Sequence, residues 1–370
     1  MYIALSVVVL LIFSFFIFLK TKQFGGRYAK RYSEVYKHSH QWDKKQFLNN
    51  EFTSMGVNLK TLPGLIVQQI RNKKLRLPEG DLPILPFAKD TFTNDVHKPK
   101  FVWYGHSVVL LHINGKNILI DPMFGPNAAP IAPTPNKRFS KDSLAVIDQL
   151  PPIDLVLFTH DHYDHLDYAS LQKLMPKVTN YFVALGVRRH LEYWGVASDH
   201  IKEFDWWQET LFEDIQITFT PSRHFSGRGI FDRGKSLWGG WVFKTKETAI
   251  YWSGDGGYGQ HFKEIGERLG PFDWAFMECG QYHSLWHQIH MYPEESVQAG
   301  QDVGAKRLVP VHWAGFALAL HAWQEPVEHF LVEAQQKHIP VCVPQLGEVV
   351  VMNEENEVVN WWEEYVVKNT

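Results

Sequence analysis

The chemistry of this chain is concentrated in residues 160–165, which hold three histidines and two aspartates within six positions. Imidazole nitrogens and carboxylate oxygens are the ligands that zinc and similar divalent metals take from proteins. The apolar run at 153–158 comes just before. It is rich in β-branched and large apolar residues and too short for a helix, so we interpret it as a buried strand. A turn at its end can point several ligands into one small volume. A polar surface loop that holds these residues by chance is the weaker interpretation.

Three further residues of metal-binding type each follow a β-type run later in the chain: His224, Asp255 and His312. A single histidine after a strand is more often a structural residue than a ligand. Their shared position changes this interpretation, because α/β sheets collect ligands at the ends of their strands. A pair of metal ions needs ligands from several strand ends, and a carboxylate in the glycine-rich turn 254–257 can bridge two ions. We therefore predict one metal centre built from all of these residues.

The elements that must position these residues alternate from about residue 100 to residue 350. An Asn-Gly pair at 114–115 between two β-type runs predicts a hairpin. Beyond it we predict strands near 153–158, 181–185, 215–220, 238–243, 248–252, 274–278, 307–311 and 341–343, and helices near 168–174, 187–194, 260–268 and 293–303. Interleaved strands and helices of this kind predict a layered α/β domain.

Composition narrows the classes of partner. The formal net charge is -3, from 37 basic and 40 acidic residues, so the chain has no overall field that would hold a polyanion. We therefore expect no nucleic-acid partner. Two cysteines, Cys279 and Cys342, are too few for a disulfide framework, and we expect both to be buried, reduced thiols.

The N-terminus predicts a membrane anchor. Residues 2–19 are apolar and uncharged, close to the length that a helix needs to cross a bilayer. A cleaved signal peptide would need a basic start and a small-residue cleavage site, and neither is evident. Positive charges follow the run instead, at Lys20, Lys22, Arg27, Lys30 and Arg31, which places the N-terminus outside and the rest of a single-pass protein in the cytoplasm. The same charges equally suit contact with anionic headgroups or a solvated linker.

The ordered set His-x-His-x-Asp-His, His, Gly-Asp and His resembles the metallo-β-lactamase superfamily. Within it the chain is similar to the N-acylphosphatidylethanolamine-hydrolysing phospholipase D family over roughly residues 100 to 350. The matching stretches include Asp205-Trp-Trp207, Leu237-Trp-Gly-Gly-Trp241, Gly270-Pro-Phe-Asp273 and Phe316-Ala-Leu-Ala319. The resemblance implies a four-layer αβ/βα sandwich, here preceded by the transmembrane helix. Together with the charge and hydropathy of the N-terminus, it predicts a division into an anchor at 1–20, a basic juxtamembrane segment and N-terminal extension at 21–95, a hydrolase domain at 96–350 and a C-terminal tail at 351–370.

The resemblance also implies roles for single residues. One zinc ion would be bound by His160, His162 and His224, and a second by Asp164, His165 and His312, with Asp255 bridging both. Iron and manganese remain open as the metals. Tyr163 and His290 match substrate-binding positions, and Asp164 and His290 match catalytic ones. The chain departs from the family at Gly256, where threonine is more frequent, and at Ala314-Gly315, which replaces Gly-Thr.

The implied reaction is hydrolysis of N-acylphosphatidylethanolamine, or a similar membrane phospholipid, to phosphatidic acid and N-acylethanolamine. A homodimer is left open. Two other functions also remain open: a metal-dependent hydrolase of a soluble phosphodiester or lactone, and a non-catalytic membrane scaffold. The complete set of candidate ligands favours an enzyme over the scaffold.

Overall fold

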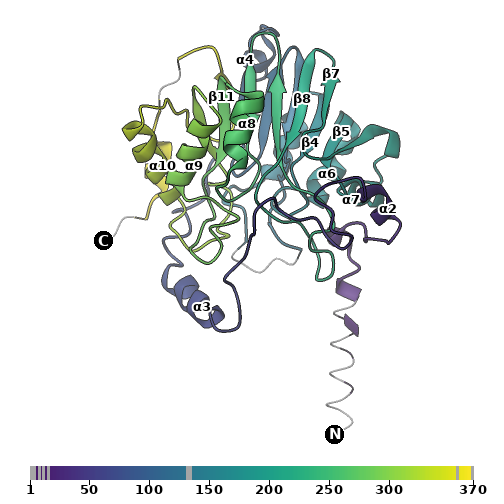
Figure 1. The fold of residues 1–370 in the computed structure, drawn as a ribbon. Helices are drawn as coiled ribbons and strands as arrows, with labels where there is room; N and C mark the ends of the chain where they lie inside the picture. Colours follow the sequence, from purple (N-terminus) through teal and green to yellow (C-terminus); the bar gives the residue numbers. More distant parts are fainter. Residues whose placement is uncertain are drawn as a thin grey trace.

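Two mixed β-sheets, stacked face to face, form the centre of the molecule (Figure 1). The structure is a computed structural model, and it describes residues 6, 10, 13–14, 17–130, 136–355 and 358–367. Within these residues the first sheet has seven strands, in the order β13 (Val349–Val351), β1 (Lys100–Trp103), β2 (Val109–Ile113), β3 (Lys116–Ile120), β4 (Ile153–Phe158), β5 (Val178–Ala184) and β6 (Ile201–Phe204). The second has six, in the order β12 (Leu308–Val311), β11 (Trp274–Glu278), β10 (Ala249–Trp252), β9 (Gly240–Lys244), β8 (Ile215–Thr220) and β7 (Glu209–Phe212).

Helices cover the outer faces of both sheets (Figure 1). Beside the first sheet lie α5 (Val146–Gln149), α6 (Tyr168–Leu174) and α7 (Arg188–Tyr193), and beside the second lie α8 (His261–Leu269), α9 (Pro293–Asp302) and α10 (Glu325–Gln336). The N-terminal part contributes α2 (Tyr32–Tyr36), α3 (Leu62–Arg71) and α4 (Lys89–Thr93). The prediction of a layered α/β fold with two sheets is confirmed.

The two sheets are joined by a core of large apolar side chains. β4 lies between β3 and β5 and is parallel to both, so its residues are covered on both faces and almost all are buried. Across the interface, the ring of Phe101 on β1 contacts those of Trp274 and Phe276 on β11, at centroid distances of 5.8 and 4.9 Å. This rigid layer holds the strand ends that carry the predicted ligands.

Two predicted strands differ from the structure. The first β-type run is divided into β1 and β2 by a turn at residues 104–107, where Gly105 and His106 have positive φ values of 84° and 54°. The strand predicted at 341–343 is wrong, because only Val341 makes an isolated bridge, to Leu308. Pro340 and Pro344 flank this segment and offer no N–H group to a ladder.

Segments before and after the strands also pack on the sandwich. Trp42 and Phe47 are buried in the same core as the strands, and near the C-terminus the Trp361 ring stacks on that of Trp313 at 5.7 Å. Among the described residues no helix is long and apolar enough to cross a bilayer. The predicted transmembrane helix falls on residues 2–19, most of which lie outside the described residues.

Candidate metal centre

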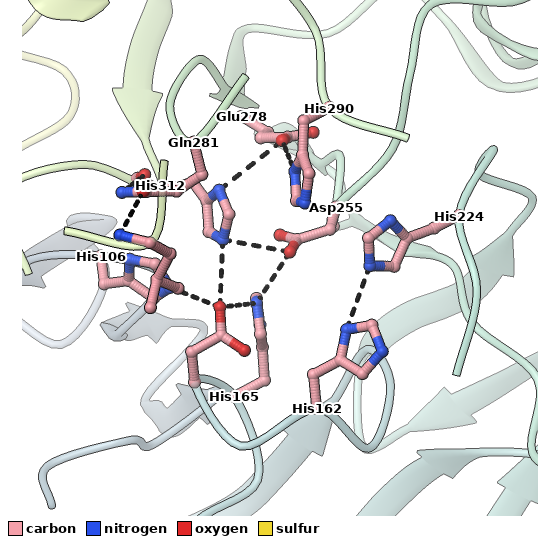
Figure 2. A network of polar contacts seen from close by, with 12 residues as sticks. His106, His162, His165, His224, Asp255, Glu278, Gln281, His290 and His312 are labelled. Carbon is pink, nitrogen blue, oxygen red and sulfur yellow. Dashed lines mark hydrogen bonds and ion pairs between the residues drawn. The ribbon is translucent and has the colours of Figure 1, made fainter. Parts of the chain in front are cut away.

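Four strand ends bring the predicted ligands together at one edge of the sandwich. Residues 160–165 follow β4, His224 follows β8, Asp255 follows β10 and His312 follows β12. Figure 2 shows these side chains converging from separate segments of the chain. The positions predicted from a shared strand-end rule therefore lie in one site, although no two of those segments adjoin in the sequence.

The first group consists of three imidazoles. Nδ1 of His162 lies 2.9 Å from Nε2 of His160 and 3.2 Å from Nε2 of His224. The three donor atoms lie within 4.8 Å of one another, close enough to share one ion. His160 and His224 are buried, whereas His162 is partly accessible. These are the three residues predicted for the first zinc ion.

The second group contains Asp164, His165 and His312, whose donor atoms also lie within 4.8 Å of one another. Oδ2 of Asp164 is 3.6 Å from Nε2 of His165 and 3.4 Å from Nε2 of His312. Asp255 lies between the groups. Its Oδ2 is 3.0 Å from Nε2 of His165, 3.1 Å from that of His312 and 3.9 Å from that of His160.

His106 belongs to the same centre and was not predicted. Its Nε2 lies 2.9 Å from Oδ2 of Asp164, and its ring packs on that of His312 at 4.2 Å. The residue occupies the left-handed turn after β1, and its backbone N–H donates to the carbonyl of Trp313. Position after a strand was the available indication, because His106 comes three residues beyond the end of β1.

Hydrogen bonds at Nδ1, on the side of each ring that faces away from the centre, fix the tautomers of three ligands. Asp121 accepts from Nδ1 of His165 (2.9 Å) and from the hydroxyl of Thr159 (2.7 Å), and this hydroxyl in turn lies 2.9 Å from Nδ1 of His160. Nδ1 of His224 donates to the carbonyl of Ile289 (2.9 Å). Because each Nδ1 carries the proton, each neutral ring presents the lone pair of Nε2 to the centre.

These lone pairs meet other acceptors rather than donors. The lone pair of His165 faces a carboxylate oxygen of Asp255 at 3.0 Å, and that of His224 faces His162 at 3.2 Å. Acceptors arranged in this way repel one another unless a cation, either a proton or a metal ion, lies between them. The ligand set therefore fits divalent metal ions, and its many imidazoles suit zinc as well as other transition metals.

In the metal-free centre, burial lowers the pKa of some histidines, whereas nearby carboxylates raise the pKa of others. Burial lowers the pKa of His162 to about 4 and that of His106 to about 3, and holds the pKa of His160 and His224 well below the usual value. Burial also opposes protonation of His165 and His312, but the nearby carboxylates, Asp255 first among them, outweigh it and raise both pKa values. Without metal the centre thus combines imidazoles that burial keeps neutral with two imidazoles whose protonation the carboxylates favour.

His290 lies beside both groups. Its ring is parallel to that of His312 at 5.2 Å and meets the ring of His224 at 5.0 Å. Its Nδ1 contacts buried Glu278, and Figure 2 shows the imidazole between Glu278 and Asp255. Glu278 also accepts from the backbone N–H of Gly256 (2.7 Å), so it connects the loop of His290 to the loop of Asp255.

Tyr163 and Asp161 make contacts away from the ligand atoms. The Tyr163 hydroxyl donates to the backbone carbonyl of Arg228 (2.6 Å), and its ring lies against the Arg228 guanidinium at 4.0 Å. Its role in substrate binding stays a prediction. Asp161 is buried and accepts from Gly227 N (2.7 Å) and from Arg189 (3.3 Å), which explains why this aspartate supports the loop instead of facing the metals.

Gly315, which stands where the family more often has threonine, has a structural reason. A Cβ atom added there would lie 2.6 Å from Cβ of His106, closer than non-bonded carbon atoms approach. A larger residue would displace His106 and, through it, Asp164. The glycine is therefore matched to the histidine that the turn after β1 places in this centre.

Comparison with known proteins gives a consistent picture. The Beta-lactamase superfamily domain matches residues 116–313. An uncharacterized protein of Mycobacterium tuberculosis is 37% identical over 289 residues, which are 77% of this chain and 77% of that protein. The N-acyl-phosphatidylethanolamine-hydrolyzing phospholipase D 1 of Caenorhabditis elegans is 31% identical over 287 residues, which are 72% of this chain and 80% of that protein.

A solved structure shows the same fold. Igni18, described as a metallo hydrolase of the archaeon Ignicoccus hospitalis KIN4/I, has a TM-score of 0.54 at 22% identity, and the likeness covers 68% of this chain and 97% of that one. With the sandwich, the paired ligand groups and the match over more than half of its length, this chain belongs to the metallo-β-lactamase superfamily of hydrolases and is related to the N-acylphosphatidylethanolamine-hydrolysing phospholipases D.

Proposed function

We propose that this chain is a phosphodiesterase of phospholipase D type that hydrolyses N-acylphosphatidylethanolamine, or a closely similar phospholipid, to phosphatidic acid and N-acylethanolamine. The observation that carries the proposal is the union of two ligand groups through one oxygen of Asp255, in a chain 31% identical to a phospholipase of this specificity. We also propose that the metals are two zinc ions, since imidazoles dominate the ligand set.

The reaction breaks the bond between phosphorus and the ethanolamine oxygen, and the oxygen of a water molecule takes its place. Bound divalent cations would lower the pKa of that water and offset negative charge on the phosphoryl oxygens. Asp164 is placed to accept a hydrogen bond from the water and orient it, since its side chain is 13% exposed whereas that of Asp255 is 2% exposed.

His290 is placed to supply the proton that the leaving oxygen needs. Glu278 holds Nδ1 of this ring, so Nε2 remains for the substrate, and the side chain is 14% exposed. A carboxylate behind a histidine fixes the orientation of its ring, as general acid–base catalysis by histidine requires. Membrane localisation is part of the proposal, because the substrate resides in the bilayer. A cytoplasmic catalytic domain is also part of it, because positive charges follow the apolar run at 2–19.

The test uses the full-length chain loaded with zinc, on vesicles that contain N-acylphosphatidylethanolamine, with both products measured by mass spectrometry. We expect wild-type protein to release phosphatidic acid and N-acylethanolamine in equal amounts, and Asp164→Ala and His290→Ala to release far less. His287→Ala is the matched control, because this exposed histidine of the same loop contacts the Ser284 carbonyl and the Tyr292 ring and none of the predicted ligands.

Two outcomes would reject the proposal in different ways. If folded protein that carries two metal ions releases neither product, the lipid assignment fails, and small phosphodiesters and lactones become the substrates to test. If the folded chain binds no metal, the hydrolase assignment itself fails.

A further inference from the structure

Helix α3 buries none of its side chains against the rest of the molecule. None of its ten residues is buried, although five of them are Leu, Ile or Val. Val67 and Ile70 are 62% and 71% exposed, and Leu59, in the turn before the helix, is 88% exposed. An isolated helix of this length is only marginally stable in water, and helices in proteins normally gain stability by packing an apolar face. The outward face of α3 therefore requires another apolar surface.

The helix is held firmly at both ends. Before it, Gly56 N donates to the carbonyl of Leu285 (2.6 Å). After it, the Asn72 amide donates to the carbonyl of Leu320 (2.9 Å), and Arg76 donates to the carbonyl of Ala319 (2.7 Å). Leu65 and Gln69 are partly covered, whereas Ile66, Val67 and Ile70 are exposed. The molecule thus presents the apolar face of α3 outwards on a fixed support.

The charge around α3 identifies what covers this face. Between Glu51 and Glu79 the sequence has no acidic residue, but it has four exposed basic ones, Lys60, Arg71, Lys73 and Lys74, besides the buried Arg76. A groove between the end of α3 and the domain is lined by Ile70, Lys73 and Lys137, and its one acidic residue, Asp81, is paired with Lys141 at 2.5 Å. An apolar helix face with a cationic border is typical of helices that lie in the interface of an anionic bilayer.

We propose that α3 is an interfacial helix that docks on the surface of an anionic phospholipid bilayer, with Ile66, Val67 and Ile70 among the acyl chains and the neighbouring lysines among the headgroups. This contact is independent of any anchor at residues 2–19. In Figure 1, α3 and the described N-terminal residues 17–24 lie at the same end of the molecule, so both can meet one membrane.

Docking of α3 would also bring the metal centre close to the membrane. Gln68 on the helix contacts Nε2 of His283 (3.2 Å), and the loop that begins there carries His290. A bilayer that covers α3 therefore lies next to the loop that forms one wall of the centre. A phospholipid could reach the centre from the membrane without passing through bulk water.

The test is a depth measurement on the full-length chain. Because both native cysteines are buried, a fluorophore can be attached selectively to Val67→Cys, with Leu211→Cys on β7 as the control. Leu211 is 71% exposed, against 62% for Val67, and Figure 1 shows β7 at the opposite end of the molecule from α3. Each protein is bound to phosphatidylcholine vesicles with or without phosphatidylglycerol, both containing a nitroxide-labelled lipid as quencher.

We expect strong quenching at position 67 on vesicles with phosphatidylglycerol and none at position 211. Lys73→Gln and Lys74→Gln should each lower the ratio of docked to undocked helix by about fivefold, and high salt should have a similar effect. Equal quenching at 67 and 211 would overturn the proposal. So would a probe at 67 that is shielded without vesicles in a concentration-dependent way, because a second copy of the chain would then cover α3. These readouts need no turnover, so they are independent of the proposed reaction.

Discussion

Asp121 sets the protonation of two ligands at once, although it does not face the centre. Its Oδ2 accepts from Thr159 and from His165, and its Oδ1 accepts from the backbone N–H of Thr159 at 2.9 Å. Each of these partners is a donor. The carboxylate therefore keeps the proton on Nδ1 of His165 and, through Thr159, on Nδ1 of His160, which leaves both Nε2 atoms free to bind metal.

Replacement of Asp121 by asparagine would leave its shape but place an amide N–H against one of these donors. One partner must then turn or change its tautomer, so we expect metal affinity to fall by about 10- to 100-fold while the fold is retained. Competition with a chelator measures this. Asp154→Asn is the control, because Asp154 lies on β4, the strand paired with β3, and accepts from Asn117 N at 2.8 Å, away from the centre. Wild-type metal affinity in Asp121→Asn would contradict the assignment.

The buried histidines predict a narrow pH range of stability for the metal-free protein. The folded-state pKa of His162 is about 4 and that of His106 about 3, against about 6.5 in the unfolded chain. Below about pH 6.5 the unfolded chain therefore binds more protons, and stability falls by about 1.4 kcal/mol per pH unit for each such group. His165 and His312 have raised pKa values, so their stabilisation is full below about pH 6.5 and is lost at higher pH.

Thermal unfolding of chelator-treated protein should consequently show its highest midpoint near pH 6.5 to 7, with a decline on both sides. Zinc-loaded protein provides the comparison and should be less sensitive on the alkaline side, where bound metal replaces the protons. A midpoint that keeps rising as the pH falls from 6.5 to 5 would show that these histidines are not held neutral by burial.

At the scale of elements, two loops touch backbone to backbone beside the centre. Gly257, in the loop that carries Asp255, has so little space that an added Cβ would lie 2.2 Å from the carbonyl carbon and oxygen of Gln288. The loop of Gln288 ends in His290. The distance between Asp255 and His290 therefore depends on the missing side chain at position 257.

Gly257→Ala should push these loops apart and displace His290. Because a displacement of about 1 Å at a reacting group can cost about 100-fold in rate, we expect turnover to fall by about 10- to 100-fold. Metal content should change less than turnover, since His290 is not one of the seven predicted ligands. Gly64→Ala is the control, as a Cβ there meets nothing within 4 Å. Wild-type turnover in Gly257→Ala would refute this account of the loop contact.

The sequence predicted the central elements well because strand ends and ligand types are local features. The strand β4 and its histidine cluster needed only a short apolar run and six residues after it. The same rule was applied to His224, Asp255 and His312 but not to Asp121 and Glu278, which also end strands, β3 and β11. His106 was missed because its turn interrupts a β-type run, and its backbone conformation depends on contacts with Trp313, more than 200 residues away.

At the scale of the whole molecule, the N-terminal segment is attached directly to the metal-binding loop through Arg228. This buried guanidinium donates to the carbonyl of Gln23 (2.7 Å), and also to those of Asp161 (2.8 Å), within the histidine cluster, and Leu166 (2.6 Å), directly after it. Nearby, the ring of Phe24 meets that of Tyr163 at 6.2 Å. Such contacts between distant segments have no local pattern, so the sequence alone does not predict them.

Arg228→Met would keep much of the volume of the side chain but leave three carbonyls without their donor. Each buried carbonyl left unpaired costs about 1 to 3 kcal/mol, so we expect a loss of at least about 3 kcal/mol in unfolding free energy. Trypsin should also cut faster after Lys22 and Arg27, because the segment would detach from the loop first. The control is Arg233→Met, since the guanidinium of Arg233 contacts Phe225 and Met55 and donates to no backbone carbonyl among the described residues. If Arg228→Met matched the wild type in both stability and cleavage rate, the N-terminal segment would not be coupled to the metal centre, and a membrane anchor could not influence catalysis along this route.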